Sequence, residues 1–181
     1  MLSKATFPLR FTFPKAGEYL VGLDFATANV LYSKTAYIKV SGQPRMGEPK
    51  LDFSTEKDFG AYHVTLTISP NNIKGGGETT LRYLIKKNKK PVADLSPYLG
   101  APMHLAVVRA DLKRFIHAHG VIPGESHTHM DHMHMNAEPG EKFGPEIESG
   151  VVFPTKGVYK IFSQVNHQGT VLLFDFMVKV Q

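Results

Sequence analysis

The chain has 181 residues, of which 42% are hydrophobic and 20% are charged, so it can bury a core as one domain or one domain plus a fragment. Its net charge of +5 is modest, and the run IKKNKK at 85–90 is typical of an exposed hairpin tip rather than a nucleic-acid-binding surface. The absence of cysteine excludes disulfides, thiolate metal ligands and thiol nucleophiles. No apolar run approaches the ~18 residues of a membrane span, and residues 1–14 lack the apolar segment of a signal peptide.

Two segments, 13–40 and 153–180, align without a gap at a constant offset of 140 residues. Both run from Phe-Pro through a glycine-containing turn into two alternating strands. The identical pairs are Phe13/Phe153, Pro14/Pro154, Gly17/Gly157, Tyr19/Tyr159, Lys39/Lys179 and Val40/Val180. The repeat predicts two copies of one domain, of which residues 1–42 retain only the C-terminal hairpin. A lone hairpin cannot bury its own faces, so we expect residues 1–42 to pack on the main domain or to pair with another chain as a homodimer.

After the hairpin, the Pro/Gly-rich stretch SGQPRMGEP predicts a linker, which we place at residues 43–60. The segments AYHVTLTISP at 61–70 and TTLRYLIKK at 79–87 alternate apolar and polar residues, as strands with one buried face do. A glycine-rich turn separates the two segments. This part of the chain is therefore expected to begin a β-sheet.

Further along, DLSPYLG at 94–100 indicates a helical turn, and MHLAVVRADLKRFIHAHG at 103–120 predicts two strands around a turn near Arg109–Leu112. Short strands, frequent turns and the lack of an amphipathic helix of ten residues favour an all-β fold. We predict a β-sandwich over residues 61–181, with a long loop at 121–149.

Seven of the nine histidines fall within a window of 31 residues. On a strand, residues i and i+2 point to the same face, so His117 and His119 lie together. A turn at 109–112 places His104 directly opposite His117, where cross-strand Cβ atoms are ~4.5–5.5 Å apart. Three neutral imidazoles from two strands form a ligand set for Cu(II) or Zn(II). The alternative is that they are polar residues on a hydrated sheet face.

The tract HTHMDHMHM at 127–135 alternates imidazoles with thioethers. Thioether sulfur prefers Cu(I), whereas imidazole accepts both copper oxidation states and zinc, so a mixed set favours copper. Loop-forming sequences flank the tract, and Asp131 could add an oxygen ligand. The candidate ligands here are His127, His129, Met130, His132, Met133, His134 and Met135. Two alternatives stay open: weak binding of many metals, and no metal role.

Other residues are weaker candidates. Met103 is expected in the core, because it points away from His104 on an ideal strand. We expect His167, in the loop of the second hairpin, to be exposed to solvent, with an approach to the metal face as the alternative. His63 is expected to be a surface residue of a strand. Glu125, Ser126 and His127 are adjacent in a loop, which does not hold the geometry of a catalytic triad.

The stretch DLSPYLGAPMHLAVVRADLKRFIHAHG, followed by FGPEI and VVFPTKGVYKIFSQVNHQG, resembles exported bacterial immunoglobulin-like domains of heavy-metal and copper contexts, which are loosely similar to YtkA-like and copper-resistance β-sandwich domains. The resemblance covers residues 60–181, and residues 1–42 match the terminal hairpin alone. It implies an exported immunoglobulin-like or cupredoxin-like sandwich with functional positions at His104, His117 and His119. The sequence departs from the pattern at Gly120, where proline commonly follows the second histidine, and in its His/Met insertion. The insertion leaves open whether the tract belongs to that site or forms a second one.

Together these features predict a non-enzymatic copper-binding protein of the periplasm or the extracellular medium, with zinc as the second metal. It would act as a chaperone, a buffer or a resistance factor. The three strand histidines would form an ordered site, and the 127–135 loop would pass the ion to or from a partner protein. Binding should weaken as pH falls through ~6.5, because only neutral imidazole binds metal. The alternatives are a protein-interaction module and a mononuclear metalloenzyme, for which Glu125 or Asp131 would serve as general base.

Overall fold

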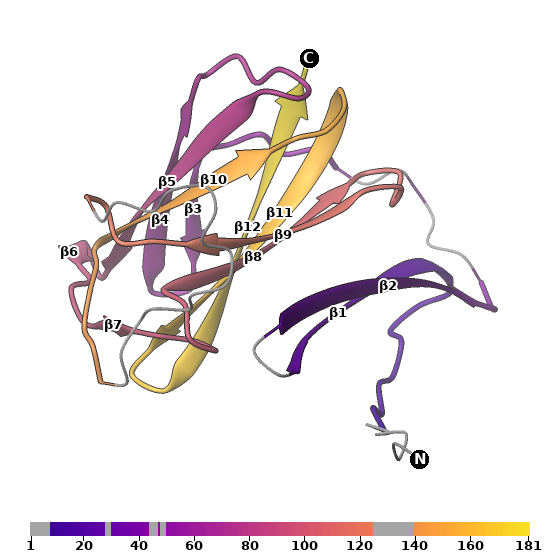
Figure 1. The fold of residues 1–181 in the computed structure, drawn as a ribbon, viewed down its shortest axis with the longest axis horizontal. Helices are drawn as coiled ribbons and strands as arrows, with labels where there is room; N and C mark the ends of the chain where they lie inside the picture. Colours follow the sequence, from indigo (N-terminus) through magenta and orange to yellow (C-terminus); the bar gives the residue numbers. More distant parts are fainter. Residues whose placement is uncertain (1–7, 28–29, 44–46, 48–49, 125–139) are drawn as a thin grey trace.

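The computed structural model describes residues 8–27, 30–43, 47, 50–124 and 140–181 (Figure 1). Strands account for all the regular structure of these residues, so none of them belongs to a helix long and apolar enough to cross a membrane. The strands are β1 (Gly17–Thr27), β2 (Val30–Val40), β3 (Glu56–Phe59), β4 (Tyr62–Ser69), β5 (Glu78–Lys87), β6 (Lys90–Pro91), β7 (Leu95–Ser96), β8 (Met103–Arg109), β9 (Phe115–Gly120), β10 (Glu146–Val152), β11 (Gly157–His167) and β12 (Thr170–Val180).

Strands β3 to β12 form two five-stranded antiparallel sheets that pack face to face (Figure 1). One sheet has the order β10-β5-β4-β3, with β6 beside β5. The other has the order β12-β11-β8-β9, with β7 beside β11. Alternate residues of β5 and β11 are buried, which is the period-two pattern of strands with one face on a core. The chain is therefore an all-β, immunoglobulin-like β-sandwich, as predicted.

Aromatic side chains join the two sheets in the core. The ring of Phe59 lies 5.0 Å from that of Phe174 and 5.9 Å from that of Phe176, between centroids. The Ser163 hydroxyl donates a hydrogen bond of 2.9 Å to the hydroxyl of Tyr83, and both residues are fully buried. Burial raises the pKa of Tyr83 well above its usual value. This polar contact crosses from one sheet to the other and fixes their separation.

Strand β9 also contacts the opposite sheet along one edge. Val121 and Glu148 exchange two backbone hydrogen bonds of 2.7 and 2.9 Å, so the chain after β9 pairs with β10. The close approach needs a glycine, because a Cβ on Gly120 would lie 2.6 Å from Cγ2 of Ile147 and 2.7 Å from Cβ of Met103. As a result, β9 is held between β8 and β10.

The β1–β2 hairpin repeats the β11–β12 hairpin in three dimensions. Both pair eleven residues with eleven, and every pair in one hairpin equals a pair in the other shifted by 140 residues. The terminal pairs are Gly17↔Val40 and Thr27↔Val30 in one hairpin and Gly157↔Val180 and His167↔Thr170 in the other. The sequence repeat therefore corresponds to a structural repeat.

The two hairpins also share the turn that precedes their first strand. The hydroxyl of Tyr19 donates to the carbonyl of Lys15 at 2.7 Å, and that of Tyr159 donates to the carbonyl of Thr155 at 2.8 Å. The same contact at the same offset shows that the first hairpin keeps the local geometry of the complete domain.

The β1–β2 hairpin lies beside the β8–β9 end of the second sheet (Figure 1). Gly22 sits against the ring of Phe115, at a place where an added Cβ would be 2.8 Å from the ring. The hydroxyl of Tyr37 donates a 2.8 Å hydrogen bond to the carbonyl of Leu112, in the turn between β8 and β9. These contacts place residues of the hairpin on the main sandwich.

Two predicted boundaries and one predicted helical turn were wrong. The linker placed at 43–60 contains β3, a four-residue edge strand that is too short to stand out by its alternation. The segment 94–100 forms β7 and a tight turn rather than a helical turn, because Leu99 and Gly100 both have positive φ (50° and 84°). The loop placed at 121–149 overlaps β10, which begins at Glu146.

Candidate metal centre

Strands β8 and β9 present the three histidines on the face of the sheet that points away from the core. Met103 is fully buried, as predicted, whereas His104 next to it is partly exposed. On β9, Ile116 and Ala118 pack against the core, and His117 and His119 alternate with them. Period-two alternation therefore puts all three imidazoles on one face.

The register between β8 and β9 differs from the prediction by two residues. His104 is directly opposite His119, and His117 is opposite Ala106. The turn lies one residue later than expected, at 110–113, and is closed by a hydrogen bond of 3.0 Å from Arg109 N to the carbonyl of Arg114. A shift of two residues keeps every side chain on the same face of the sheet, so the three histidines still lie together.

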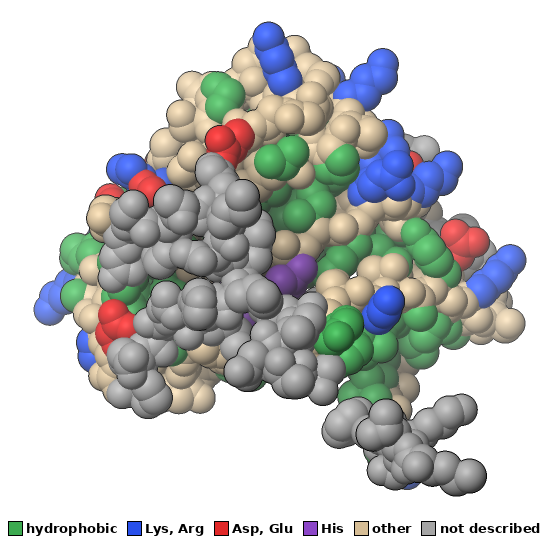
Figure 2. Space-filling model, viewed as in Figure 1, with side chains coloured by type: hydrophobic (Ala, Val, Ile, Leu, Met, Phe, Trp, Pro, Cys, Tyr) green, Lys and Arg blue, Asp and Glu red, His purple; other side chains and the backbone are tan. Residues whose placement is uncertain are grey.

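His104, His117 and His119, the three-histidine cluster, have their rings in contact. The Nε2 atoms of His117 and His119 are 2.8 Å apart. The ring centroid of His104 is 4.6 Å from that of His119 and 5.6 Å from that of His117. One ring nitrogen from each of the three residues lies within 4.8 Å of the others, and all three side chains are half-buried. Figure 2 shows histidine side chains near the middle of this face, beside apolar side chains.

These separations fit a shared metal ion. Two nitrogens bound to one ion at ~2.0–2.1 Å are about 2.8–3.0 Å apart at a right angle and about 3.3 Å apart at a tetrahedral angle. The Nε2 atoms of His117 and His119 are at hydrogen-bond distance, 2.8 Å, and the ligand atom of His104 is within 4.8 Å of the other two. The three ligand atoms are therefore close enough for rotation about the side-chain bonds to direct them to one ion. Three protein ligands leave a fourth position open.

Two neighbours of the cluster were not among the site residues predicted from the sequence. Gln164 on β11 is directly opposite His104, on the other side of β8 from His119. Tyr98 meets His104 edge to face, with ring centroids 5.7 Å apart. Gln164 lies within the sequence FSQ at 162–164, but its place beside His104 depends on the pairing of β8 with β11. Only that long-range pairing could have identified Gln164 as a neighbour of the cluster.

The remaining sequence candidates separate into two groups. The residues of the tract, His127, His129, Met130, His132, Met133, His134 and Met135, lie outside the described residues, as do Glu125 and Asp131. His63 is partly exposed and contacts the carboxylate of Asp58 at 2.8 Å.

The prediction that His167 is exposed was wrong. This side chain is 4% exposed, and its two ring nitrogens contact the Tyr62 hydroxyl at 2.6 Å and Asp94 Oδ1 at 2.9 Å. Gln168 donates to the other oxygen of Asp94 at 3.0 Å. Hydrogen bonds from Gln168 and His167 lower the pKa of Asp94. His167 therefore joins strands of both sheets and is not a ligand of the cluster.

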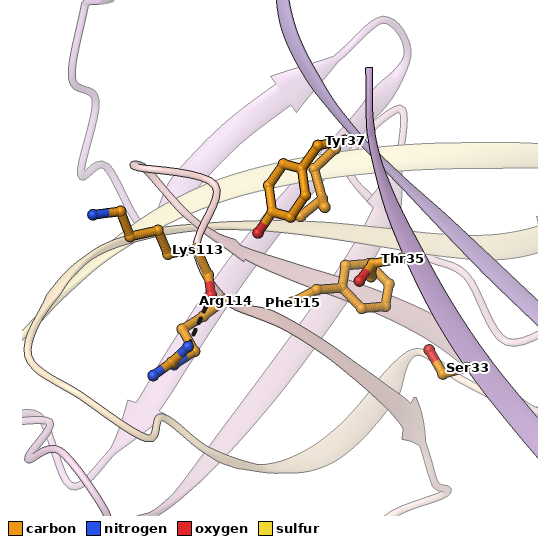
Figure 3. A pocket seen from close by; sticks show the side chains of 7 residues that line it. Ser33, Thr35, Tyr37, Lys113, Arg114 and Phe115 are labelled. Carbon is orange, nitrogen blue, oxygen red and sulfur yellow. Dashed lines mark hydrogen bonds between the residues drawn. The ribbon is translucent and has the colours of Figure 1, made fainter. Parts of the chain in front are cut away.

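A separate cleft of about 420 Å³ lies between the β1–β2 hairpin and the β8–β9 turn (Figure 3). The side chains that line it are Leu20, Ser33, Thr35, Tyr37, Lys113, Arg114 and Phe115. The cluster histidines do not line this cleft, although Phe115 is two residues before His117 on the same face of β9.

A family model described as "Domain of unknown function (DUF8832)" matches residues 55–181, and the chain belongs to this family. The search of curated proteins gave no match. Among solved structures, the crystal structure of the S-layer protein SbsC domains 4 and 5 is similar with 12% sequence identity and a TM-score of 0.33. That similarity covers 91% of this chain and 65% of the other, so the chain spans less than two thirds of that structure's length.

Proposed function

We propose that this member of the DUF8832 family binds copper through His104, His117 and His119 on the outer face of β8 and β9. The observation that carries the proposal is the convergence of three imidazole nitrogens within 4.8 Å on adjacent strands. Neutral imidazole is a ligand for both copper and zinc. The core does not require these side chains, because Met103, Leu105 and Val107 fill the inner face of β8.

One feature of the sequence favours copper over zinc. In the sequence, the chain continues from β9 to Met130, Met133 and Met135, whose thioethers suit Cu(I). Zinc is the competing metal.

The type of site supports a role in handling copper, as a chaperone, buffer or resistance factor. Three ligands with an open fourth position allow an incoming ligand to bind before the ion leaves. The half-buried side chains leave the site within reach of a donor or acceptor protein. A chain without cysteine suits a copper protein of the periplasm or the extracellular medium, where thiols would cross-link.

Titration with Cu(II), followed by electron paramagnetic resonance, tests this proposal. We expect uptake of copper near stoichiometric amounts, with hyperfine structure from coordinated nitrogen. The triple variant His104→Ala/His117→Ala/His119→Ala should lose that signal. His63→Ala, a matched change of a strand histidine outside the cluster, should keep it, and so should a deletion of residues 127–135.

Two results would overturn the assignment. One is a wild-type protein that takes up no copper near stoichiometric amounts. The other is a triple variant that binds copper with wild-type affinity and spectrum. Competition with Zn(II) in the same titration identifies the preferred metal, and preference for zinc would contradict the choice of copper.

A further inference from the structure

One face of the β1–β2 hairpin is apolar and open to solvent. Leu23, Phe25, Tyr32 and Ile38 lie on this face and are 37–48% exposed. Phe25 and Tyr32 are a directly opposed pair whose rings stack at 5.4 Å. We call these four residues the apolar hairpin face.

In the repeated hairpin the equivalent face is buried. At the constant offset of 140, Leu23 corresponds to Ser163 and Ile38 to Val178, both of which face the core. There the sheet of β3, β4, β5 and β10 covers β11 and β12, for example through the Phe59 ring on Phe174. The first hairpin thus keeps the side of a strand pair that normally packs on a second β-layer.

The hairpin contacts the main sandwich through its other face. Gly22, Thr35 and Tyr37 alternate with the residues of the apolar hairpin face, and they are the ones that meet the β8–β9 turn (Figure 3). Contact through one face leaves the opposite face pointing away from the sandwich. The apolar hairpin face is therefore presented outward, where another molecule can reach it.

We propose that the apolar hairpin face packs against the same face of a second copy of this chain. Four of the thirteen large hydrophobic side chains that are exposed among the described residues lie on the apolar hairpin face. A second copy therefore offers the same concentration of exposed apolar side chains. A contact of a surface with itself closes as a two-fold dimer, so no open-ended assembly results. This inference does not depend on the metal site.

The chemistry of the face suits a match with itself. Lys34 lies opposite Leu23 and is the charged residue on this face, and its long side chain can keep its ammonium in water at the rim. Phe13 extends the apolar area, because its ring packs on Tyr19 at 4.8 Å. Two such hairpins would form a small two-layer β-structure, with layers about 10 Å apart.

The size of the face predicts a weak dimer. An eleven-residue strand is ~37 Å long, and two strands cover a width of ~10 Å, so each copy contributes on the order of 400 Å². The two copies together would bury about 800 Å², which is below the ~1,200 Å² of stable specific interfaces and in the range of weak, transient ones. We therefore expect a reversible dimer with a dissociation constant in the micromolar range.

Sedimentation equilibrium of the full chain, with EDTA present to remove any contribution from metal, tests the proposal. The wild type should change from monomer to dimer as its concentration rises through the micromolar range. The variant Leu23→Thr/Phe25→Thr removes apolar area but keeps β-forming residues, and it should weaken the dimer by at least about tenfold. The matched control is Val171→Thr/Leu173→Thr on β12, where both side chains are similarly exposed, and it should dimerise like the wild type.

Circular dichroism of each variant verifies that the sandwich is folded. A wild type that stays monomeric at all concentrations would overturn the proposal, and so would a Leu23→Thr/Phe25→Thr variant that dimerises like the wild type. The latter result would indicate pairing through strand edges, because edge pairing uses backbone groups that these substitutions leave unchanged. Copper binding is measured separately, so failure of either proposal leaves the other intact.

Discussion

Replacing Gly120 with alanine tests whether the contact between β9 and β10 supports the candidate site. The added Cβ would lie 2.6 Å from Cγ2 of Ile147 and 2.7 Å from Cβ of Met103. Carbon atoms in ordinary contact are ~3.5–4.0 Å apart, so the neighbours or β9 itself must move by about 1 Å. Ile147 and Met103 are fully buried, which leaves them little room to move. Overpacking of this kind costs about 1–3 kcal/mol, and a loss of about 2 kcal/mol lowers the melting temperature of such a domain by roughly 6–10 °C.

Gly150 in β10 provides the control for this substitution. Its added Cβ would meet no atom within 4 Å, and neither glycine has a positive φ, so the two alanine variants differ in available space. Calorimetry should show a clear decrease in melting temperature for Gly120→Ala, and little change or a small increase for Gly150→Ala. The Gly120→Ala variant should also bind copper less tightly, because the residue is next to His119. Equal melting temperatures for the two variants would refute the steric argument.

Two further predictions concern polar contacts. Tyr83→Phe should lower the free energy of unfolding by about 1–3 kcal/mol, because the buried Ser163 hydroxyl loses its acceptor. Chemical denaturation should show almost no loss for the control Tyr32→Phe, whose ring is 40% exposed, and an equal loss in both would contradict the assignment. The pKa of Asp94 is below its ordinary 3.8, so the folded protein binds this proton less tightly than the unfolded chain. The stability that Asp94 contributes is therefore present above pH 3.8 and is lost as the pH falls through the lowered pKa. Asp94→Asn should reduce this acid sensitivity in denaturation midpoints measured at several acidic pH values, and an unchanged pH profile would refute its role.

Local alternation predicted the faces of the side chains better than it predicted their pairing. The pattern of β8 and β9 correctly placed His104, His117 and His119 on one face, because strand periodicity requires no knowledge of the partner strand. The prediction that His104 lies opposite His117 was wrong, because register depends on where the turn closes. Leu112 adopts a positive φ of 62° there, which is uncommon for leucine and could not be predicted from the sequence.

Features that depend on distant segments were not predictable. His167 appeared exposed because it ends a hairpin strand, but Tyr62 and Asp94 enclose it from parts of the chain 105 and 73 residues away. The edge strand β3 was missed because four residues carry too little pattern. By contrast, the 140-residue repeat predicted the equivalence of the two hairpins, since identical turns and alternation fix the same register twice.

The position of the three-histidine cluster separates its role from that of the fold. Inward residues of β8 and β9 supply the packing, and the imidazoles on the opposite face contribute little to the core. A metal ion held by all three imidazoles would bind the folded state, because the fold is what brings the three ligand atoms within 4.8 Å of one another. Added copper should therefore raise the melting temperature of the wild type near neutral pH, and the triple alanine variant should unfold at a temperature that copper does not change.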